Sequence, residues 1–470
     1  MVTERLSADP WSPCRCNAGE TASWCTSRVA SSRTVSSWPS TPRGLRAEAA
    51  TGWFPVARSA EVGTTPLTVG AAGHAYVVLR LRPGAEVTAL SARCPHRLVP
   101  LAAATVVDGR LQCPYHGWQF NAEGRCVDIP SLGPAGTPPP RADLSAPWAV
   151  EERDDWVWLA PDPTSAARPP RLGGTAPAPE PVPDLPQPAG PVLDNLHPAL
   201  EHAWHPVALA GELLPGGYVQ TRLLGRTWTV HRSRGGSLDA DSPAWGVVER
   251  YGVIWVAPAE PRDELIAVPE STDAQVTASW LPPVRTIASA GPLADAFLDA
   301  AHRPFVHGGT SGAADLQEVP VPDLSPERGG FSSIRDDDRH RTTLVYRAPF
   351  QLLRRDVDQG TGAATTVLRL LQPEDADSTR IYTCVLLRAA DGAVPPDVVA
   401  EEVELQAVVL GEDLALQAQL ASSGLPLLPR DELHVRADRL GVALRQALAD
   451  LAADCAAADS AAALQHRATA

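Results

Sequence analysis

Two short segments, each pairing a cysteine with a histidine, constrain the fold of this chain more than any other feature. The first reads CPH at 94–96, and the second reads CPYH at 113–116, with 16 residues between them. A Gly-Trp pair and the turn residues 121–124 follow the second segment, so we expect a tight β-hairpin there. Two thiols and two imidazoles carried by two loops indicate a metal centre around which the loops must fold together.

These four side chains suit either of two metal centres, a structural zinc or a Rieske [2Fe-2S] cluster. In a Rieske cluster one iron takes two cysteines and the other takes two histidines, so each loop supplies one of each. Cys94 with His96, and Cys113 with His116, meet that requirement. We therefore predict a [2Fe-2S] cluster at these four residues and keep zinc as the alternative.

The sequence CPHR…CPYHGWQF resembles the Rieske domain of the Rieske non-haem iron oxygenases. Respiratory Rieske proteins carry a disulfide between the two loops, but the corresponding positions here are Val99 and Tyr115, so this disulfide cannot form. The resemblance extends over about 52–455, and the local motif is similar to the vanillate-demethylase branch. It implies an α+β fold, with a β-rich Rieske domain followed by a catalytic domain of antiparallel sheet wrapped by helices.

The resemblance also implies a mononuclear Fe(II) held by two histidines and one carboxylate. The family pattern Asp-x2-His-x4-His occurs twice, as Asp299/His302/His307 and as Asp194/His197/His202. Spacing alone leaves both open. The residues around the first, AFLDAAHRPFVH, are similar to the helix-to-loop segment of the family, whereas the second runs directly into a predicted strand. We therefore predict His302 and His307 as the iron ligands.

The third iron ligand is implied by the resemblance to lie on the long helix after the sheet. We predict Asp413 for it, with the adjacent Glu412 as the competing carboxylate. Asp299 receives a different role, because the family uses an Asp at this position to bridge a Rieske histidine and an iron-ligand histidine. A helix expected over 292–302, ended by a proline, would place Asp299 and His302 on one side. A carboxylate between two imidazoles fixes their orientation and offers a short electron path.

The chain repeats part of its own sequence on either side of a proline-rich stretch. The segment WFPVA at 53–57 recurs as WHPVA at 204–208, and ERDDWVWLAP at 152–161 recurs as ERYGVIWVAP at 249–258. The second copy is shorter in its middle, where the first copy holds the Cys/His motifs. It is therefore interpreted as a cluster-free scaffold.

Composition and these motifs together predict six parts. They are a disordered N-terminus at 1–50, which holds Cys14 and Cys16, a Rieske domain at 52–161, a Pro-rich linker at 162–191, a truncated Rieske-like repeat at 204–258, a catalytic domain at 259–456, and a disordered tail at 457–470.

The charge balance excludes one class of partner. With 40 basic and 55 acidic residues the net charge is −15, which argues against nucleic-acid binding.

There is no apolar run of about 18 residues, so we expect no membrane-spanning helix. The N-terminus lacks the pattern of a secretory signal, so a cytoplasmic protein is expected.

The resemblance implies an O2-dependent monooxygenase or dioxygenase that hydroxylates or oxidatively demethylates a small aromatic or heterocyclic substrate. Its electrons would come from an NAD(P)H-dependent reductase, a ferredoxin or both, and it would form a homo-oligomer, a trimer in the family. The alternative is a Rieske electron-transfer protein with an inactive catalytic domain. The intact set His302, His307 and Asp413 argues against that alternative.

Overall fold

The computed structural model describes residues 51–163, 166–171, 180–184, 188–310, 318–420 and 424–469. The predicted disorder of 1–50, with Cys14 and Cys16, and parts of the 162–191 linker lie outside the described residues. Every element below belongs to one compact unit that begins at residue 44.

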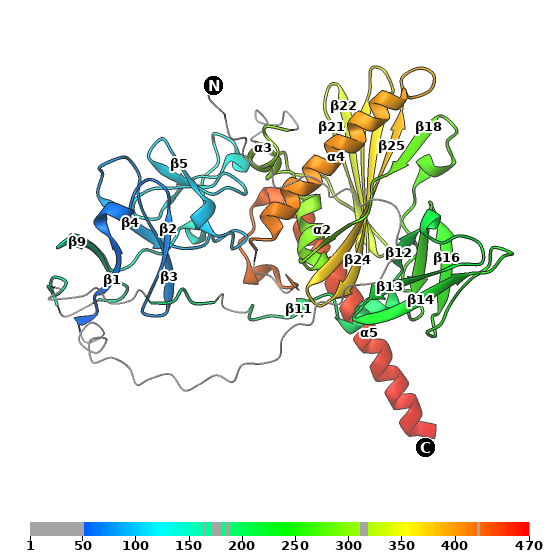
Figure 1. Cartoon of the computed structure of the whole chain (residues 1–470), viewed down its shortest axis with the longest axis horizontal. Helices are drawn as coiled ribbons and strands as arrows, with labels where there is room; N and C mark the ends of the chain where they lie inside the picture. The colour runs from blue at the N-terminus through cyan, green and yellow to red at the C-terminus, as the bar shows by residue number, and fades with distance from the viewer. Residues whose placement is uncertain are drawn as a thin grey trace, which may run out of the picture. The chain divides into compact units, whose positions relative to one another are not determined.

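The first domain is built from three small antiparallel sheets (Figure 1). One has the order β1-β10-β9, the second β2-β3-β4, and the third β5-β6-β7-β8. Their strands are β1 Phe54–Arg58, β2 Leu67–Ala71, β3 His74–Arg80, β4 Val87–Ser91, β5 Thr105–Val107, β6 Arg110–Gln112, β7 Gln119–Phe120, β8 Cys126–Asp128, β9 Ala149–Arg153 and β10 Trp156–Ala160. The β-branched and aromatic strands bury a core that includes Val56, Val78 and Leu159. The third sheet carries the two Cys/His loops.

A second β unit repeats the strand order of the first two sheets. Its sheets have the orders β12-β17-β16 and β13-β14-β15. The strands are β12 His205–Leu209, β13 Tyr218–Leu223, β14 Arg226–Arg232, β15 Leu238–Ala240, β16 Gly246–Arg250 and β17 Val253–Ala257. A register shift interrupts β1 between Pro55 and Ala57, and the same shift occurs in β12 between Pro206 and Ala208. We propose on this basis that 204–258 is a second copy of the β framework without the cluster-binding sheet.

The third part is an eight-stranded antiparallel sheet with helices packed against it, which makes the protein α+β (Figure 1). The strand order is β18-β25-β24-β23-β22-β21-β20, and β19 also pairs with β25. The bounds are β18 Val276–Trp280, β19 Val284–Thr286, β20 Ser325–Glu327, β21 Gly330–Asp336, β22 His340–Arg347, β23 Gln351–Asp358, β24 Ala364–Asp375, β25 Ser378–Arg388, α2 Ala290–Leu298, α3 Arg303–Val306, α4 Pro396–Gln417 and α5 Arg439–Thr469. The two-residue strands β11 Val192–Leu193 and β26 Leu425–Pro426 form a separate pair.

The helix expected over 292–302 is wrong in its end point. Helix α2 stops at Leu298, and Asp299 has an extended backbone with φ −78° and ψ 130°. Pro304 does not break a helix, because it lies in the first turn of α3, where a missing N–H costs nothing. Asp299 and His302 therefore do not share a helical face but approach each other across the turn between α2 and α3.

Helix α5 runs through Thr469, over the range in which the sequence predicts a disordered tail (Figure 1, red). The reason is composition, because residues 452–463 are rich in alanine, which has the highest helix propensity. None of the helices in the described part of the chain is both long and apolar enough to cross a membrane.

Candidate metal centres

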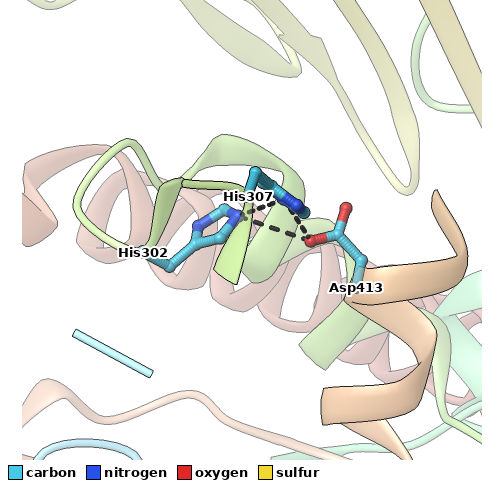
Figure 2. A group of neighbouring side chains, drawn as sticks. All are labelled: His302, His307 and Asp413. Carbon is cyan, nitrogen blue, oxygen red and sulfur yellow. Dashed lines mark hydrogen bonds and ion pairs between the residues drawn. The ribbon is translucent and has the colours of Figure 1, made fainter. Parts of the chain in front are cut away.

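Two histidines from one turn and an aspartate distant in sequence meet at one buried point, His302, His307 and Asp413 (Figure 2). The Nε2 atoms of the two histidines lie 3.2 Å apart. Asp413 Oδ1 lies 3.4 Å from His302 Nε2 and 3.0 Å from His307 Nε2. Within the described residues this is the one group of three or more whose ligand atoms converge enough to hold a metal ion. The structure thus brings together all three residues that the sequence predicts as iron ligands.

The local fold explains how the two histidines face one point. His302 precedes the four-residue helix α3 and His307 follows it, so one helical turn carries both rings to the same side. Asp413 comes from the last turns of α4 and is 5% exposed. Two imidazoles and one carboxylate on one side of a metal leave positions free on the other, which is the donor set of non-haem Fe(II) centres. These residues therefore fit the predicted mononuclear iron.

Each of the two histidines has a carboxylate at its other ring nitrogen. Glu412 Oε2 lies 2.7 Å from His307 Nδ1, and Asp299 Oδ2 lies 3.6 Å from His302 Nδ1. Such outer carboxylates fix the tautomer and orientation of a metal-binding imidazole. Glu412, considered above as a competing ligand, thus contacts the outer face of His307 rather than the converging atoms.

The electrostatics of the triad favour a charged, hydrogen-bonded state. Burial alone would lower the pKa of His302, but the carboxylates of Asp299 and Asp413 raise it to about 9. Burial would raise the pKa of Asp413, yet the two histidines hold it well below its usual value. A cation at this point would take over the positive charge that the imidazolium now supplies.

The four Cys/His residues of the two loops are also buried together. Cys94, His96, Cys113 and His116 are each no more than 2% exposed. The Nδ1 atoms of the two histidines lie 3.1 Å apart, so both rings present the same nitrogen to one point. A hydrogen bond between the thiols lowers the pKa of Cys113, and burial raises that of Cys94. Two thiols and two Nδ1 atoms supplied one each per loop fit the predicted [2Fe-2S] cluster.

The outward Nε2 atoms of the two loop histidines each meet a carboxylate. His116 Nε2 lies 2.5 Å from Asp299 Oδ2, and His96 Nε2 lies 3.0 Å from both oxygens of Asp438. Asp299 therefore contacts a loop histidine and the triad histidine His302 with one oxygen atom. Burial opposes its charge, but His116 holds the pKa of Asp299 well below its usual value.

Close packing supports this contact between the loops and the triad segment. Gly117, next to His116, has φ +69°, and a Cβ there would overlap the ring of Phe305 in α3. Only glycine combines this backbone with this approach, which brings the second loop against the turn that holds His302 and His307.

Sequence reasoning missed Asp438, which contacts His96, the histidine of the first loop. It lies just before α5, within the 3-10 turn Arg436–Asp438, and its side chain also accepts a hydrogen bond from the backbone N–H of Val435. That N-terminal capping pattern was the readable signal, but it indicates a helix start rather than a partner 342 residues away. Arg97, beside His96, is buried within 3.4 Å of both Asp438 and Asp295, which balances the charges.

The second copy of the Asp-x2-His-x4-His pattern does not form a site. His197 Nδ1 accepts a hydrogen bond from the backbone of Ala199, and His202 Nδ1 contacts the carbonyl of Glu260. Asp194 Oδ1 accepts from the backbone of Leu196. These side chains therefore stabilise a local turn and are directed to different partners.

A cavity of 390 Å³ adjoins the triad, within the size range of small-molecule sites. Its apolar lining is Phe297, Leu298, Leu344, Leu352, Leu353, Val367, Leu405 and Val409, and three arginines, Arg303, Arg354 and Arg369, also line it. A larger cavity of 580 Å³ lies between the β20–β21 hairpin and α5, away from all of these metal-binding residues. The smaller cavity is the candidate substrate site, because it alone of the two borders the triad.

Known proteins are similar to this chain in two separate regions. Residues 52–140 match the Rieske [2Fe-2S] domain, and residues 316–454 match the vanillate O-demethylase oxygenase C-terminal domain. Protein TIC 55 of Arabidopsis thaliana is 47% identical over 70 residues, which are 14% of this chain and 13% of that protein. Methylxanthine N1-demethylase NdmA of Pseudomonas putida is 35% identical over 135 residues, 26% of this chain and 37% of that protein. Dicamba O-demethylase of Stenotrophomonas maltophilia is 36% identical over 117 residues, 25% and 33% of the two chains.

These matches cover well under half the length of each of the three relatives. Among solved structures, Pseudomonas putida NdmA with theobromine aligns with 19% identity over 85% of this chain and 90% of its own, at a TM-score of 0.38. The crystal structure of dicamba monooxygenase aligns with 14% identity over 86% and 98%, at a TM-score of 0.34.

Proposed function

We propose that this chain is an O2-dependent oxygenase, because residues 52–140 match the Rieske [2Fe-2S] domain and residues 316–454 match the vanillate O-demethylase oxygenase C-terminal domain. In this proposal it hydroxylates or oxidatively demethylates a small organic molecule in the cavity beside His302, His307 and Asp413. The observation that carries the proposal is the position of Asp299, which joins a cluster histidine to an iron-ligand histidine.

The protein's own residues have distinct tasks in this proposal. Fe(II) held by His302, His307 and Asp413 would supply O2 activation, and a cluster held by the two Cys/His loops would supply electrons. Asp299 accepts the N–H of His116, which fixes that ring, and lies 3.6 Å from His302 Nδ1, so it stands between the two rings on the proposed electron path. Glu412 does the same for His307. The leucine and valine side chains of the cavity exclude water and hold the apolar part of the substrate.

We further propose that electrons reach the cluster from an NAD(P)H-dependent reductase, a ferredoxin or both, and that the protein forms a homo-oligomer, with a trimer as the first state to test. A cytoplasmic location belongs to the same proposal. Sedimentation of the purified protein tests the oligomer, and reduction of the cluster by candidate reductases tests the electron donor.

Metal analysis and electron paramagnetic resonance of the purified protein test the main proposal. An oxygenase is expected to hold about three irons per chain, two in the cluster and one at the triad. It should also consume O2 when it is supplied with a reductant and a substrate. Only two irons would support the electron-transfer alternative, and zinc in place of iron at the two loops would support a structural module. The buried triad beside a cavity disfavours both alternatives.

A further inference from the structure

The candidate substrate cavity is surrounded by positive charge from three different elements. Arg303 comes from α3, Arg354 from β23 and Arg369 from β24, and all three line the same 390 Å³ space. A second cavity of 70 Å³ borders Arg303 and Arg354 and adds Arg335 to the group. Arginine side chains are rarely buried without an anionic partner, so the partner of each one decides what the cavity can bind.

Two of the three arginines already have partners. Arg354 pairs with Asp356, with 2.8 Å between Nε and Oδ2. Arg369 donates from one terminal nitrogen to Gln406 at 3.3 Å, and its other terminal nitrogen lies 4.0 Å from Asp413 Oδ2. The Nε atom of Arg369 is buried without a hydrogen-bond partner. The charge of Arg369 is therefore partly balanced by the carboxylate of Asp413.

Among the described residues, Arg303 is the arginine of this cavity without an ion-pair partner. No carboxylate of these residues lies within 4.0 Å of its guanidinium, although its side chain is only partly exposed. An arginine guanidinium stays charged in proteins, and this one lines the cavity together with that of Arg354. Keeping a cation here against burial and repulsion costs free energy that an anion in the cavity would return.

The acidic residues of the lining are engaged by other groups. Asp356 pairs with Arg354 and accepts a hydrogen bond from Thr342, so it offsets the Arg303 charge only in part. Glu402 accepts a hydrogen bond from Gln406 Nε2 at 2.9 Å. Asp299 and Asp413 face the histidines of the metal-binding groups. The nearest unpaired charge in the cavity is thus positive and lies one residue after His302.

We propose that the substrate is a small organic carboxylate, whose anionic group pairs with Arg303 while its apolar body lies along the leucine and valine wall beside the triad. A guanidinium binds a carboxylate through two parallel hydrogen bonds, which fixes the orientation as well as the position of the bound molecule. This inference names the substrate class of the proposed oxygenase and rests on that proposed function.

Calorimetric titration of the full chain, loaded with cluster and Fe(II) and kept free of O2, tests the inference. The probes are benzoate, phenylacetate and cinnamate, each compared with its own uncharged amide. At least one acid is expected to bind about 10- to 100-fold more tightly than its amide, the range of a charged hydrogen bond. Arg303→Met should remove that preference, and Arg303→Lys should keep part of it.

Arg328→Met is the matched control, because this substitution removes the same charge from a side chain that is 88% exposed. It should leave the preference for the acid unchanged. The inference is overturned if none of the acids binds, if each amide binds as tightly as its acid, or if Arg303→Met keeps the preference. Iron content, the cluster spectrum and O2 uptake judge the oxygenase proposal separately, so the two can fail independently.

Discussion

Asp299 Oδ2 lies 2.5 Å from His116 Nε2, a nitrogen on a ring that is 183 residues earlier in the sequence. The same oxygen faces His302 Nδ1 at 3.6 Å. A single, mostly buried carboxylate therefore lies between the two predicted metal centres, hydrogen-bonded to the His116 ring and facing the His302 ring.

Replacing this carboxylate by its amide should slow electron transfer without emptying either centre. Asp299→Asn keeps the size of the side chain but removes the charge that attracts both imidazoles. We expect about 10- to 100-fold slower oxidation of the reduced cluster on exposure to O2 and substrate, measured by stopped-flow absorbance. Iron content and the cluster spectrum should stay near those of the wild type, and wild-type cluster oxidation in the variant would contradict the bridging role.

Mixing two defective chains tests whether this contact acts within one chain. In the structure His116 and Asp299 belong to the same chain, which predicts that mixed oligomers of Asp299→Asn and Cys113→Ser recover no turnover. Recovered activity would instead show that the cluster of one subunit serves the iron of another.

Substitution of one loop cysteine should remove the cluster. Cys113→Ser is expected to abolish the visible absorption and the reduced electron paramagnetic resonance signal, because oxygen is a poor ligand for this centre. Cys126→Ser is the control, since Cys126 is also buried but lies outside the two loops. A surviving signal in Cys113→Ser would overturn the cluster assignment.

Removing an imidazole from the triad should empty the iron site alone. His302→Ala is expected to lower bound iron by about one per chain while the cluster spectrum stays intact. His197→Ala should leave both centres loaded, because that ring bonds only to its own turn. The opposite pattern would move the iron site to the segment 194–202.

Most of the metal-binding residues can be predicted from the sequence because they belong to short patterns whose spacing is set by local chain geometry. One Cys and one His per loop, and two histidines on either side of one helical turn, are short-range patterns that the structure brings together. Asp413 is readable only through resemblance, since a carboxylate on a long helix is common. The resemblance likewise predicts the α+β class, whereas the strand order is seen only in the structure.

Long-range partners carry no such local pattern. Asp438 meets His96 across 342 residues, and Arg303 lines a cavity whose other walls come from β23, β24 and α4. The contact between Asp438 and His96 depends on how distant segments pack together, so neither segment predicts it alone. The end of α2 at Leu298 was missed for a different reason, because a proline is equally compatible with stopping one helix and starting the next.

The outer carboxylate of His307 should control iron affinity. Glu412→Gln removes the charge 2.7 Å from His307 Nδ1, and we expect iron to bind about 10- to 100-fold more weakly in competition with a chelator. Glu404→Gln, an exposed position on the same helix, is the matched control and should bind iron normally. Equal affinities in the two variants would exclude this role for Glu412.

The last prediction concerns Arg445, a buried arginine that joins α5 to the helix preceding Asp299. Arg445 is fully buried on α5 and donates to both oxygens of Asp295 at 2.8 and 2.9 Å, and also to Glu432. Because Asp295 lies on α2, this bidentate pair fixes α2, whose end carries Asp299, against α5. The pKa of Asp295 is lowered because the Arg445 charge outweighs its burial, so the pair stabilises the fold above the ordinary pKa of an Asp.

Arg445→Met removes the bidentate partner of Asp295 and the partner of Glu432, and leaves Asp295 only Arg97 at 3.4 Å. It should destabilise the protein by about 3 to 5 kcal/mol at neutral pH. The loss should shrink as the pH falls and Asp295 becomes protonated, because the depressed pKa gives stability only where the carboxylate is charged. Urea unfolding monitored by circular dichroism at several pH values measures both effects. Arg436→Met, at a half-exposed arginine nearby, should change stability little, and a similar loss in that control would contradict the buried pair.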